Sequence, residues 1–275
     1  MSTEHSAKSV RQQVFGWKDM ALYALAIGAG ESDLDYLLEP DPKVLPSWAV
    51  IPALDPVFDV MRESGLAAPQ LVHSAQRVEQ LAPLPSHGTV STEGCLKGAW
   101  NVRIGTMVQI ETTSSVGDQL CARTLWSLFI PGSKAGDTGR APTLLRTRPP
   151  KDTAPAFAEE WATQPTQALL YRLTGDLNPI HARPDLAREA GFERPILHGL
   201  CTYGFATRVA LKHLAGNEPR RFRSFEARFT RPVLPGQTLV VEGYPLEPGS
   251  AAVVVRIKET GEMAVGHGLF EYEEG

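Results

Sequence analysis

Asp176, Asn178 and His181 place a carboxylate, an amide and an imidazole within one short stretch of the chain. A carboxylate can take a proton from water, and an imidazole titrates near neutral pH and can share the acid–base work. An amide can hold a water molecule or a substrate oxygen. This combination of side chains suits a site that adds water to a substrate.

The spacing of these residues requires a loop, because a continuous helix would rotate Asp176 and His181 by about 140° from each other. Gly175 permits a bend, and Pro179 favours an extended conformation at Asn178. Pro179 can then start a single helical turn. The sequence therefore predicts an extended segment followed by a turn, which aims the three side chains into one pocket.

A second stretch, from Pro195 to Gly199, leads into an apolar segment that predicts a helix over residues 197–214. Gly199 has no side chain, so a carbonyl oxygen can approach the N–H groups at the start of this helix. The helix dipole favours negative charge that develops on such an oxygen. We interpret His198 as a packing or capping residue, with an oxyanion-side role as the alternative, and Cys201 as a small buried residue.

The elements that must position these residues follow the same order in both halves of the chain. A short apolar helix after Asp19, ended by Gly28 and Gly30, precedes strands predicted at residues 88–95, 100–112 and 119–129. The second half has the helix at 197–214, followed by strands at 224–230, 237–244, 251–259 and 262–272. A helix followed by an antiparallel meander, twice over, predicts an α+β fold rather than a parallel sheet.

The two halves share identical residues at an offset of 149 positions, and chance agreement of common turn residues is the alternative explanation. The matching pairs are Pro83 with Pro232, Thr89 with Thr238, Glu93 with Glu242, and Gly94 with Gly243. Between the halves, a stretch rich in Pro, Gly, Ser, Thr and Arg predicts a flexible linker. The predicted organisation is an N-terminal unit at residues 1–130, a linker at 131–155 and a C-terminal unit at 156–275.

Composition excludes several classes of partner. The 27 basic and 31 acidic residues give a net charge of −4 without a long basic run, so nucleic acid is not an expected partner. Three cysteines without a C-x-x-C pair fit a reducing, cytoplasmic compartment. The longest apolar stretch near the N-terminus, residues 20–29, is too short to span a membrane, and no secretory signal is evident.

Other site types have weaker sequence support. The Gly28-Ala29-Gly30 sequence follows a helix pattern and has Asp33 where a third glycine belongs, so we reject a dinucleotide site. The chain has no Gly-x-Ser-x-Gly motif, which removes the best support for a serine nucleophile. Asp176, His181 and His198 could form a metal site of two histidines and a carboxylate, but we expect no metal.

These motifs resemble those of the hydratase 2 proteins in the MaoC-like family, and the resemblance covers nearly the whole chain apart from the linker. The matching segments are Tyr171-Arg172-Leu173-Thr174-Gly175-Asp176, Asn178-Pro179-Ile180-His181, Ala190-Gly191-Phe192, Pro195-Ile196-Leu197-His198-Gly199-Leu200-Cys201-Thr202, Ala227-Arg228-Phe229 and Pro232-Val233-Leu234-Pro235-Gly236. The N-terminal half resembles the degenerate repeat of that family in Tyr23-Ala24-Leu25, Gly28-Ala29-Gly30, Leu45-Pro46 and Pro83-Leu84-Pro85.

The resemblance implies a tandem (double) hot-dog fold, in which each half is a helix wrapped by an antiparallel sheet and the N-terminal unit widens the acyl tunnel. It implies a (3R)-specific 2-enoyl-CoA hydratase that needs no cofactor, acts on an acyl-CoA thioester and forms a homodimer. Asp176 and His181 would be the catalytic pair, Asn178 would orient water or substrate, and the Gly199 N–H would form the oxyanion hole. A hot-dog thioesterase and a non-catalytic acyl-CoA binding subunit are the alternatives.

Two departures from the family pattern bear on substrate binding. Arg183 stands where the family often has Asp before Pro184, and His73-Ser74-Ala75-Gln76 lacks a glycine that members commonly carry there. Arg183, Arg228 and Arg231 are candidate contacts for CoA phosphates, because guanidinium groups suit phosphate geometry. A solvated arginine face is the alternative interpretation.

Overall fold

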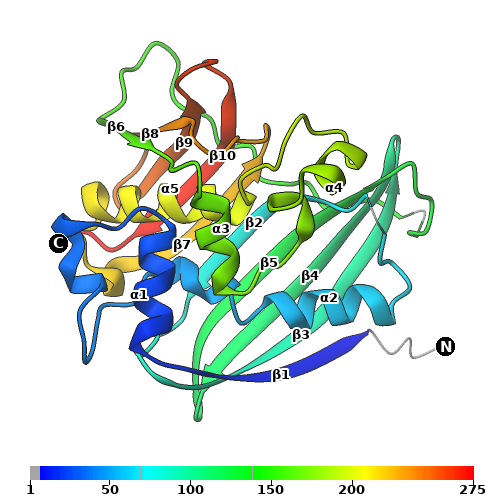
Figure 1. Ribbon diagram of the computed structural model, residues 1–275, viewed down its shortest axis with the longest axis horizontal. Coiled ribbons are helices and arrows are strands. Elements are labelled where there is room, and N and C mark those ends of the chain that lie inside the picture. The colour runs from blue at the N-terminus through cyan, green and yellow to red at the C-terminus, as the bar shows by residue number, and fades with distance from the viewer. Residues whose placement is uncertain (1–6, 69, 138) are drawn as a thin grey trace.

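The computed structural model describes residues 7–68, 70–137 and 139–275, and its framework is one ten-stranded antiparallel sheet with helices against one face (Figure 1). The strand order is β1-β3-β4-β5-β2-β7-β10-β9-β8-β6. The N-terminal strands are β1 Lys8–Phe15, β2 Val72–Gln80, β3 Gly88–Val102, β4 Gly105–Val116 and β5 Gln119–Pro131. The C-terminal strands are β6 Phe157–Ala162, β7 Phe222–Phe229, β8 Thr238–Pro245, β9 Ser250–Ile257 and β10 Met263–Tyr272.

Read from each edge of the sheet toward its centre, the strands of the two halves follow the same order. Each N-terminal strand has a counterpart five strands later, so that β1 corresponds to β6 and β3 to β8, and the two halves meet where β2 pairs with β7. The residues that repeat at an offset of 149 lie in β3 and β8 or in the segments that lead into these strands. The α+β fold and its internal repeat are therefore confirmed, in the tandem hot-dog arrangement that the resemblance implies.

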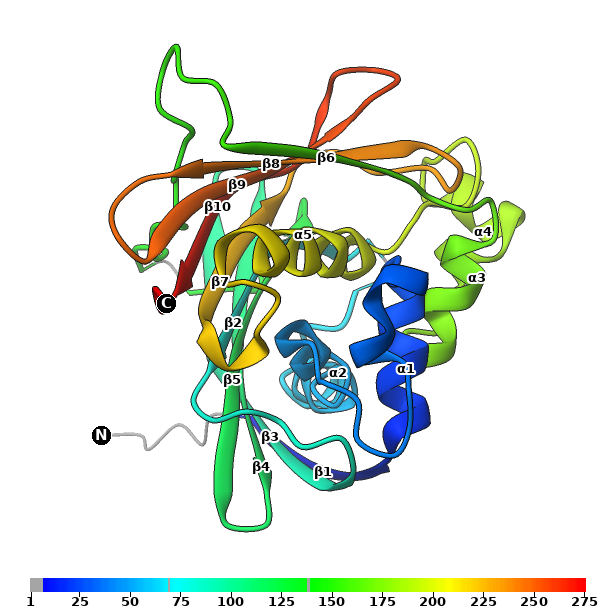
Figure 2. The ribbon, with the colours of Figure 1, turned by 90° about the vertical axis from the view of Figure 1, so that its left-hand side faces the viewer.

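The C-terminal half of the sheet curves over the helix α5, Gly199–Leu214 (Figure 2). This helix is buried along most of its length, from Leu200 to Leu211. The helix predicted at residues 197–214 is thus confirmed, with a start two residues later. The start moves because His198 has a non-helical ψ of 134°, and the Leu197 N–H before it donates to the Val233 carbonyl.

In the N-terminal half, the helix against the sheet is α2, Leu54–Glu63, preceded by the 3-10 turn η2, Pro46–Val50. The prediction that the first apolar helix would fill this place is wrong. That helix forms as α1, Trp17–Ala26, but it packs against α3, Gln167–Tyr171, and the following turn. The sequence does not predict α2, because it has prolines at 46, 52 and 56 and proline normally interrupts a helix interior.

One predicted strand also needs correction. The segment predicted as a strand at 100–112 contains a hairpin turn, because β3 ends at Val102 and β4 begins at Gly105. The strands predicted in the second half are confirmed within two residues at each end as β7 to β10. The remaining helical elements are α4 Pro184–Glu189 and the 3-10 turns η1 Glu31–Tyr36, η3 Arg172–Thr174, η4 Pro179–His181 and η5 Pro219–Arg221.

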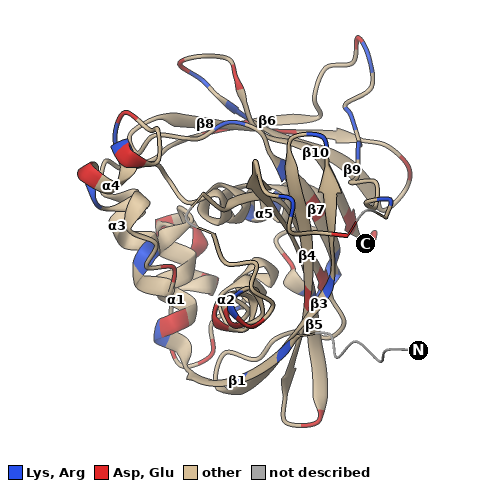
Figure 3. Cartoon of the chain, turned by 90° about the vertical axis from the view of Figure 1, so that its right-hand side faces the viewer, with Lys and Arg blue, Asp and Glu red and all other residues tan. Residues whose placement is uncertain are grey.

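Between β5 and β6, the described residues form no helix or strand beyond a single bridge between Trp100 and Asp137. Basic and acidic residues are interspersed along the elements rather than separated onto two faces (Figure 3). Within the described part of the chain, no helix has the length and apolar character needed to cross a bilayer.

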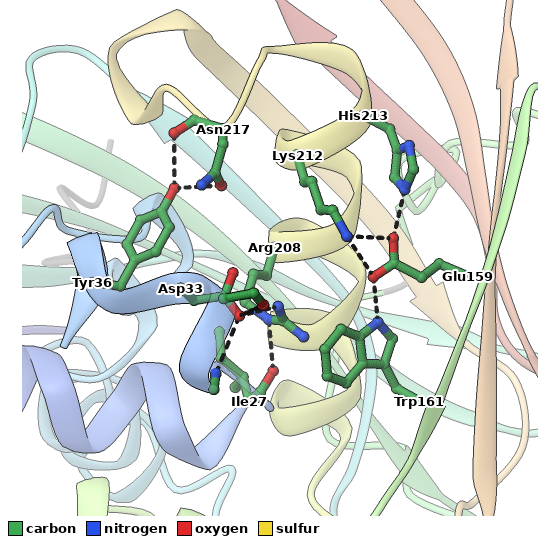
Figure 4. A network of polar contacts seen from close by, with 11 residues as sticks. Ile27, Asp33, Tyr36, Glu159, Trp161, Arg208, Lys212, His213 and Asn217 are labelled. Carbon is green, nitrogen blue, oxygen red and sulfur yellow. Dashed lines mark hydrogen bonds and ion pairs between the residues drawn. The ribbon is translucent and has the colours of Figure 1, made fainter.

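A buried ion pair ties the two halves together on the side of α5 that faces the N-terminal unit (Figure 4). The Arg208 Nη1 lies 3.1 Å from Asp33 Oδ2, and the two side chains are only 2% and 6% exposed. Arg208 also donates from Nε to the Ile27 carbonyl at 3.1 Å and lies 4.1 Å from the centre of the Trp161 ring. The pair is desolvated, so the loss of either partner would leave an uncompensated charge in the core.

We predict that Asp33→Asn lowers the free energy of unfolding by about 3–5 kcal/mol, because it leaves the Arg208 charge buried without a partner. The double variant Asp33→Asn/Arg208→Met should recover part of this loss, since Met keeps apolar contacts without a charge. Urea unfolding followed by circular dichroism measures both. Glu262→Gln, which breaks the exposed pair with Arg231, is the control and should change stability by less than about 1 kcal/mol. Losses that simply add in the double variant would contradict the interpretation.

Candidate active site

The loop that carries the three predicted acid–base residues has the local shape expected from its sequence. Gly175 adopts φ +137°, a conformation that favours glycine, and turns the chain out of η3. Asn178 is extended at φ −53° and ψ 120°, and Pro179 then opens the turn η4, which ends at His181. We call residues 175–181 the acid–base loop.

Two short side chains hold this loop by accepting backbone hydrogen bonds. Asp176 Oδ1 accepts from the Asn178 N–H at 3.2 Å, and Asn178 Oδ1 accepts from the Ile180 N–H at 3.3 Å. The first bond orients the Asp176 carboxylate and leaves Oδ2 available as an acceptor. Asn178 uses its carbonyl oxygen within the loop, so its side-chain amide N–H groups are the part that can reach a water molecule or substrate.

His181 is buried and its tautomer is defined by its neighbour. Its Nδ1 lies 2.9 Å from the carbonyl oxygen of Ile196, and a carbonyl can only accept, so Nδ1 carries the proton and donates. Burial lowers the pKa of His181 below its ordinary value. The imidazole is therefore neutral at pH 7, with the lone pair of Nε2 available to accept a proton.

His198 lies against both other members of this group. Its Nε2 lies 3.2 Å from the backbone carbonyl oxygen of Asp176, and its ring stacks on the His181 ring with centroids 3.7 Å apart. One donor atom from each of Asp176, His181 and His198 lies within 4.8 Å of the others. His198 is the N-cap residue of α5, but its side chain makes no capping hydrogen bond, so its contacts are with the acid–base loop.

The start of α5 lies beside this group. Gly199 is the first residue of the helix, and its N–H is among the first-turn donors that no helical carbonyl can satisfy. A Cβ at this position would lie 3.2 Å from the ring of Phe229, so only glycine fits without displacing that ring. The open N–H and the positive end of the helix dipole suit an oxygen that gains negative charge.

The N-terminal half contributes a wall to the same region. His73 lies in the segment that departs from the family pattern. Its ring contacts the Phe229 ring edge-on, with ring centres 4.9 Å apart, and stacks on the Trp126 ring, with ring centres 4.8 Å apart. Burial lowers the pKa of His73 to about 4. The contact from His73 through Phe229 to Gly199 links β2 of one half to the helix start of the other.

A metal site does not fit the arrangement of the donor atoms. Two imidazoles that bind one ion direct their in-plane lone pairs toward it, whereas the His181 and His198 rings are stacked with an interplanar angle of 27°. The geometry favours proton transfer over metal binding.

The candidate CoA contacts lie in different places. Arg183 is paired with Asp185 at 2.8 Å on the surface, and Arg231 is paired with Glu262 at 3.0 Å. Arg228 precedes Phe229 in β7, so its side chain points to the face of the sheet opposite to Gly199. The structure thus brings Asp176 and His181 together beside the helix start at Gly199, whereas Asn178 is exposed in the same loop. Arg228 lies on the other face of the sheet.

Two contributors to this site have no local sequence signal. The Ile196 carbonyl that fixes the His181 tautomer is a backbone group, which no residue pattern reveals. The bond from His198 to the Asp176 carbonyl joins residues 22 positions apart and depends on the fold. A histidine directly before a helix-start glycine is the only sequence feature that points to His198.

Family models match both halves of the chain. The model described as "MFE-2 hydratase 2 N-terminal domain" matches residues 14–132, and the model described as "MaoC like domain" matches residues 146–261. The second match contains the acid–base loop and the start of α5.

Individual relatives extend this similarity along the chain. "Probable enoyl-CoA hydratase 2" of Dictyostelium discoideum is 33% identical over 92% of this chain and 89% of its own length. Mouse "Peroxisomal multifunctional enzyme type 2" is 34% identical over 90% of this chain, which spans 35% of that longer protein. The solved "MaoC-like dehydratase from Phytophthora Capsici" is 30% identical with a TM-score of 0.88, covering 98% of this chain and 97% of that one.

The buried neutral histidines predict a specific loss of stability in acid. Their folded-state pKa values lie below the ordinary value of about 6.5, so the unfolded chain binds more protons as the pH falls below 6.5. Stability is therefore fully present above pH 6.5 and declines toward each folded-state pKa. His73→Phe should make this decline shallower by about 1.4 kcal/mol per pH unit between pH 6 and pH 5.

Urea unfolding at a series of pH values measures this slope. Trp126→Phe is the matched control, because it alters the same ring stack without removing a titrating group. The control should lower stability at every pH and keep the wild-type slope. An unchanged slope in His73→Phe would contradict the assignment of His73 as a buried neutral imidazole.

Proposed function

The chain belongs to the MaoC-like family of hydratase 2 proteins, and from this membership we propose that it is a (3R)-specific 2-enoyl-CoA hydratase. The observation that carries the proposal is the pairing of two proton acceptors, the Asp176 carboxylate and His181 Nε2, beside the open N–H of Gly199. This arrangement provides a base for water and a donor for the substrate carbonyl oxygen in the same place.

The first step follows from the tautomer of His181. Because Nδ1 donates to Ile196, Nε2 is an acceptor, and the Asp176 carboxylate is also an acceptor. A water molecule held between them donates one hydrogen to each group. Its oxygen then presents a lone pair to C3 of a trans-2-enoyl thioester, and Asn178 can donate from its side-chain amide to steady the water or substrate.

The second step is attack and protonation. The water oxygen forms a bond to C3 while one acceptor takes its proton, and the π electrons of the double bond move through C2 to the thioester oxygen. The Gly199 N–H at the start of α5 stabilises the enolate oxygen, a contribution of about two to three orders of magnitude in rate. The proton returns to C2 from the same side, which gives syn addition and a 3-hydroxyacyl thioester.

We predict that Asp176→Asn and His181→Gln each lower kcat for hydration by about 10² to 10⁴-fold, since each removes one of the two acceptors. The assay is the loss of enoyl thioester absorbance with trans-2-butenoyl-CoA and trans-2-decenoyl-CoA, with chiral analysis of the product. Asp118→Asn, an exposed carboxylate in the hairpin between β4 and β5, is the matched control and should retain full activity.

The same assay separates the alternative functions. Release of free thiol in place of the (3R)-alcohol would replace hydration with thioester hydrolysis. Tight binding of an enoyl-CoA without turnover would favour a non-catalytic subunit. The acceptor pair supports catalysis over simple binding, because a binding protein does not need two proton acceptors beside an open helix N-terminus.

We also propose that the protein is a cytoplasmic homodimer and that its substrate is carried on CoA rather than on another acyl carrier. The odd number of cysteines supports a reducing compartment. The exposed side chains of Arg183 and Arg231 support CoA, because they can exchange their carboxylate partners for its phosphates. We expect a dimer mass in analytical ultracentrifugation and recovery in the cytosolic fraction of the source cells. A monomer mass, or recovery in peroxisomes, would contradict the respective part of this proposal.

A further inference from the structure

His198 is the one side chain in this site whose contacts include both acid–base residues, judged within the described part of the chain. It donates to the Asp176 carbonyl at 3.2 Å and covers one face of the His181 ring at 3.7 Å. Tyr171 also packs against His198, with the two ring centres 4.9 Å apart. His198 is 1% exposed, so these contacts fill its surroundings.

The one hydrogen bond of His198 holds its ring proton on the Asp176 carbonyl, so this proton is not available for transfer to a substrate. The Asp176 carbonyl can only accept, so Nε2 of His198 carries the proton and Nδ1 holds the lone pair. That Nδ1 is fully buried and has no hydrogen-bond partner among the described residues. Burial, followed by the charge of His181 when protonated, lowers the pKa of His198 to about 2. His198 therefore stays neutral while other groups move protons.

The acid–base loop needs support from its inner side, because its outer side faces solvent. Leu173 and Leu177, which flank the bend at Gly175, are 62% and 61% exposed. The internal hydrogen bonds of the loop join neighbouring residues and do not anchor it to the body of the protein. The bond from His198 anchors the peptide of Asp176 to the N-cap residue of a buried helix.

We propose that His198 is a positioning residue that holds the Asp176 carboxylate and the His181 imidazole at the separation needed to share one water molecule. This inference rests on the proposed hydration function. Its N–H fixes the backbone of Asp176, and its ring fixes the plane of His181, so one side chain sets both acceptors relative to each other. A displacement of about 1 Å between such groups can lower a rate by about 10²-fold.

Two substitutions separate the two contacts. His198→Phe keeps an aromatic ring against His181 but loses the N–H to Asp176. His198→Gln keeps an N–H donor but opens one face of His181 to water. We expect each variant to lower kcat by about 10- to 100-fold with less than about threefold change in KM, because the groups that bind the substrate are untouched.

The pH profile of kcat/KM distinguishes the two variants. Catalysis needs neutral His181, so activity falls in acid as the pH passes the lowered pKa of His181. The groups that face His181 are Asp176 in the loop and His198 at the N-cap of α5, and Arg172 in η3 lies near His198. In His198→Gln, access of water raises the pKa of His181, and the acid limb moves to higher pH. In His198→Phe, the ring stays covered and the limb stays at its wild-type position.

A double-mutant comparison tests whether His198 acts through Asp176. In the Asp176→Asn background, His198→Phe should lower the remaining activity by less than about threefold, because the carboxylate that it positions is absent. His213→Phe is the matched control, since His213 also stacks on a ring, that of Phe157, and bonds to a carboxylate, Glu159, away from the loop. The control should keep wild-type kcat and an unshifted pH profile.

Wild-type activity in both His198 variants would overturn the proposal. Losses of activity that multiply with that of Asp176→Asn, together with unshifted pH profiles in both variants, would overturn it as well.

If neither variant folds, NMR of the wild-type protein with labelled histidine tests the proposal. The Nε2 proton of His198 should be protected from exchange and His181 should carry its proton on Nδ1, and rapid exchange or the opposite tautomer would overturn the inference. These signals do not depend on hydratase activity, so failure of the proposed function is seen separately in the wild-type assay.

Discussion

The antiparallel pairing of β2 with β7 is the contact on which the rest of the structure depends. It joins two half-sheets of five strands into one sheet and gives the two halves a continuous hydrophobic core. The site lies at this seam. The ring of Phe229 on β7 covers Gly199 and contacts His73 from β2. At the bend of the acid–base loop, a Cβ on Gly175 would lie 3.5 Å from the Leu54 side chain of the N-terminal half. A half alone would therefore have an incomplete site.

The two halves have the same strand order but different tasks. In the C-terminal half, the segment after α3 forms the acid–base loop at the start of α5. In the N-terminal half, the segment after α1 contributes Asp33, which binds Arg208 in the second half of α5. One helix thus receives a reactive loop at its N-terminus and a buried ion pair farther along. The ion pair and its neighbours Ile27 and Trp161 fix the orientation of α5, and so the direction of its open N–H groups.

The sequence predicted the C-terminal half better than the N-terminal half, for a physical reason. The helix α5 and the strands β7 to β10 have clear periodic patterns, and the glycine and proline of the acid–base loop dictate its local shape. The helix α2 is not predictable from the sequence pattern, because prolines stand before it and in its first turn. The strands β1, β2 and β6 depend on pairing partners that lie far away in the chain. The contacts of His198 and the Ile196 carbonyl were also inaccessible, since they exist only after the sheet closes over α5.

The protonation states connect the stability of this fold with its chemistry. A neutral His181 with its proton on Nδ1 is needed if water is to be held between two acceptors, and burial beneath His198 provides that state. The same burial opposes protonation, so the folded state loses stability relative to the unfolded chain as pH falls. A more exposed imidazole would be easier to fold in acid, but more of it would be protonated near neutral pH and unable to accept a proton from water. The position of the stacked pair, inside the protein yet at the end of an exposed loop, follows from these opposing requirements.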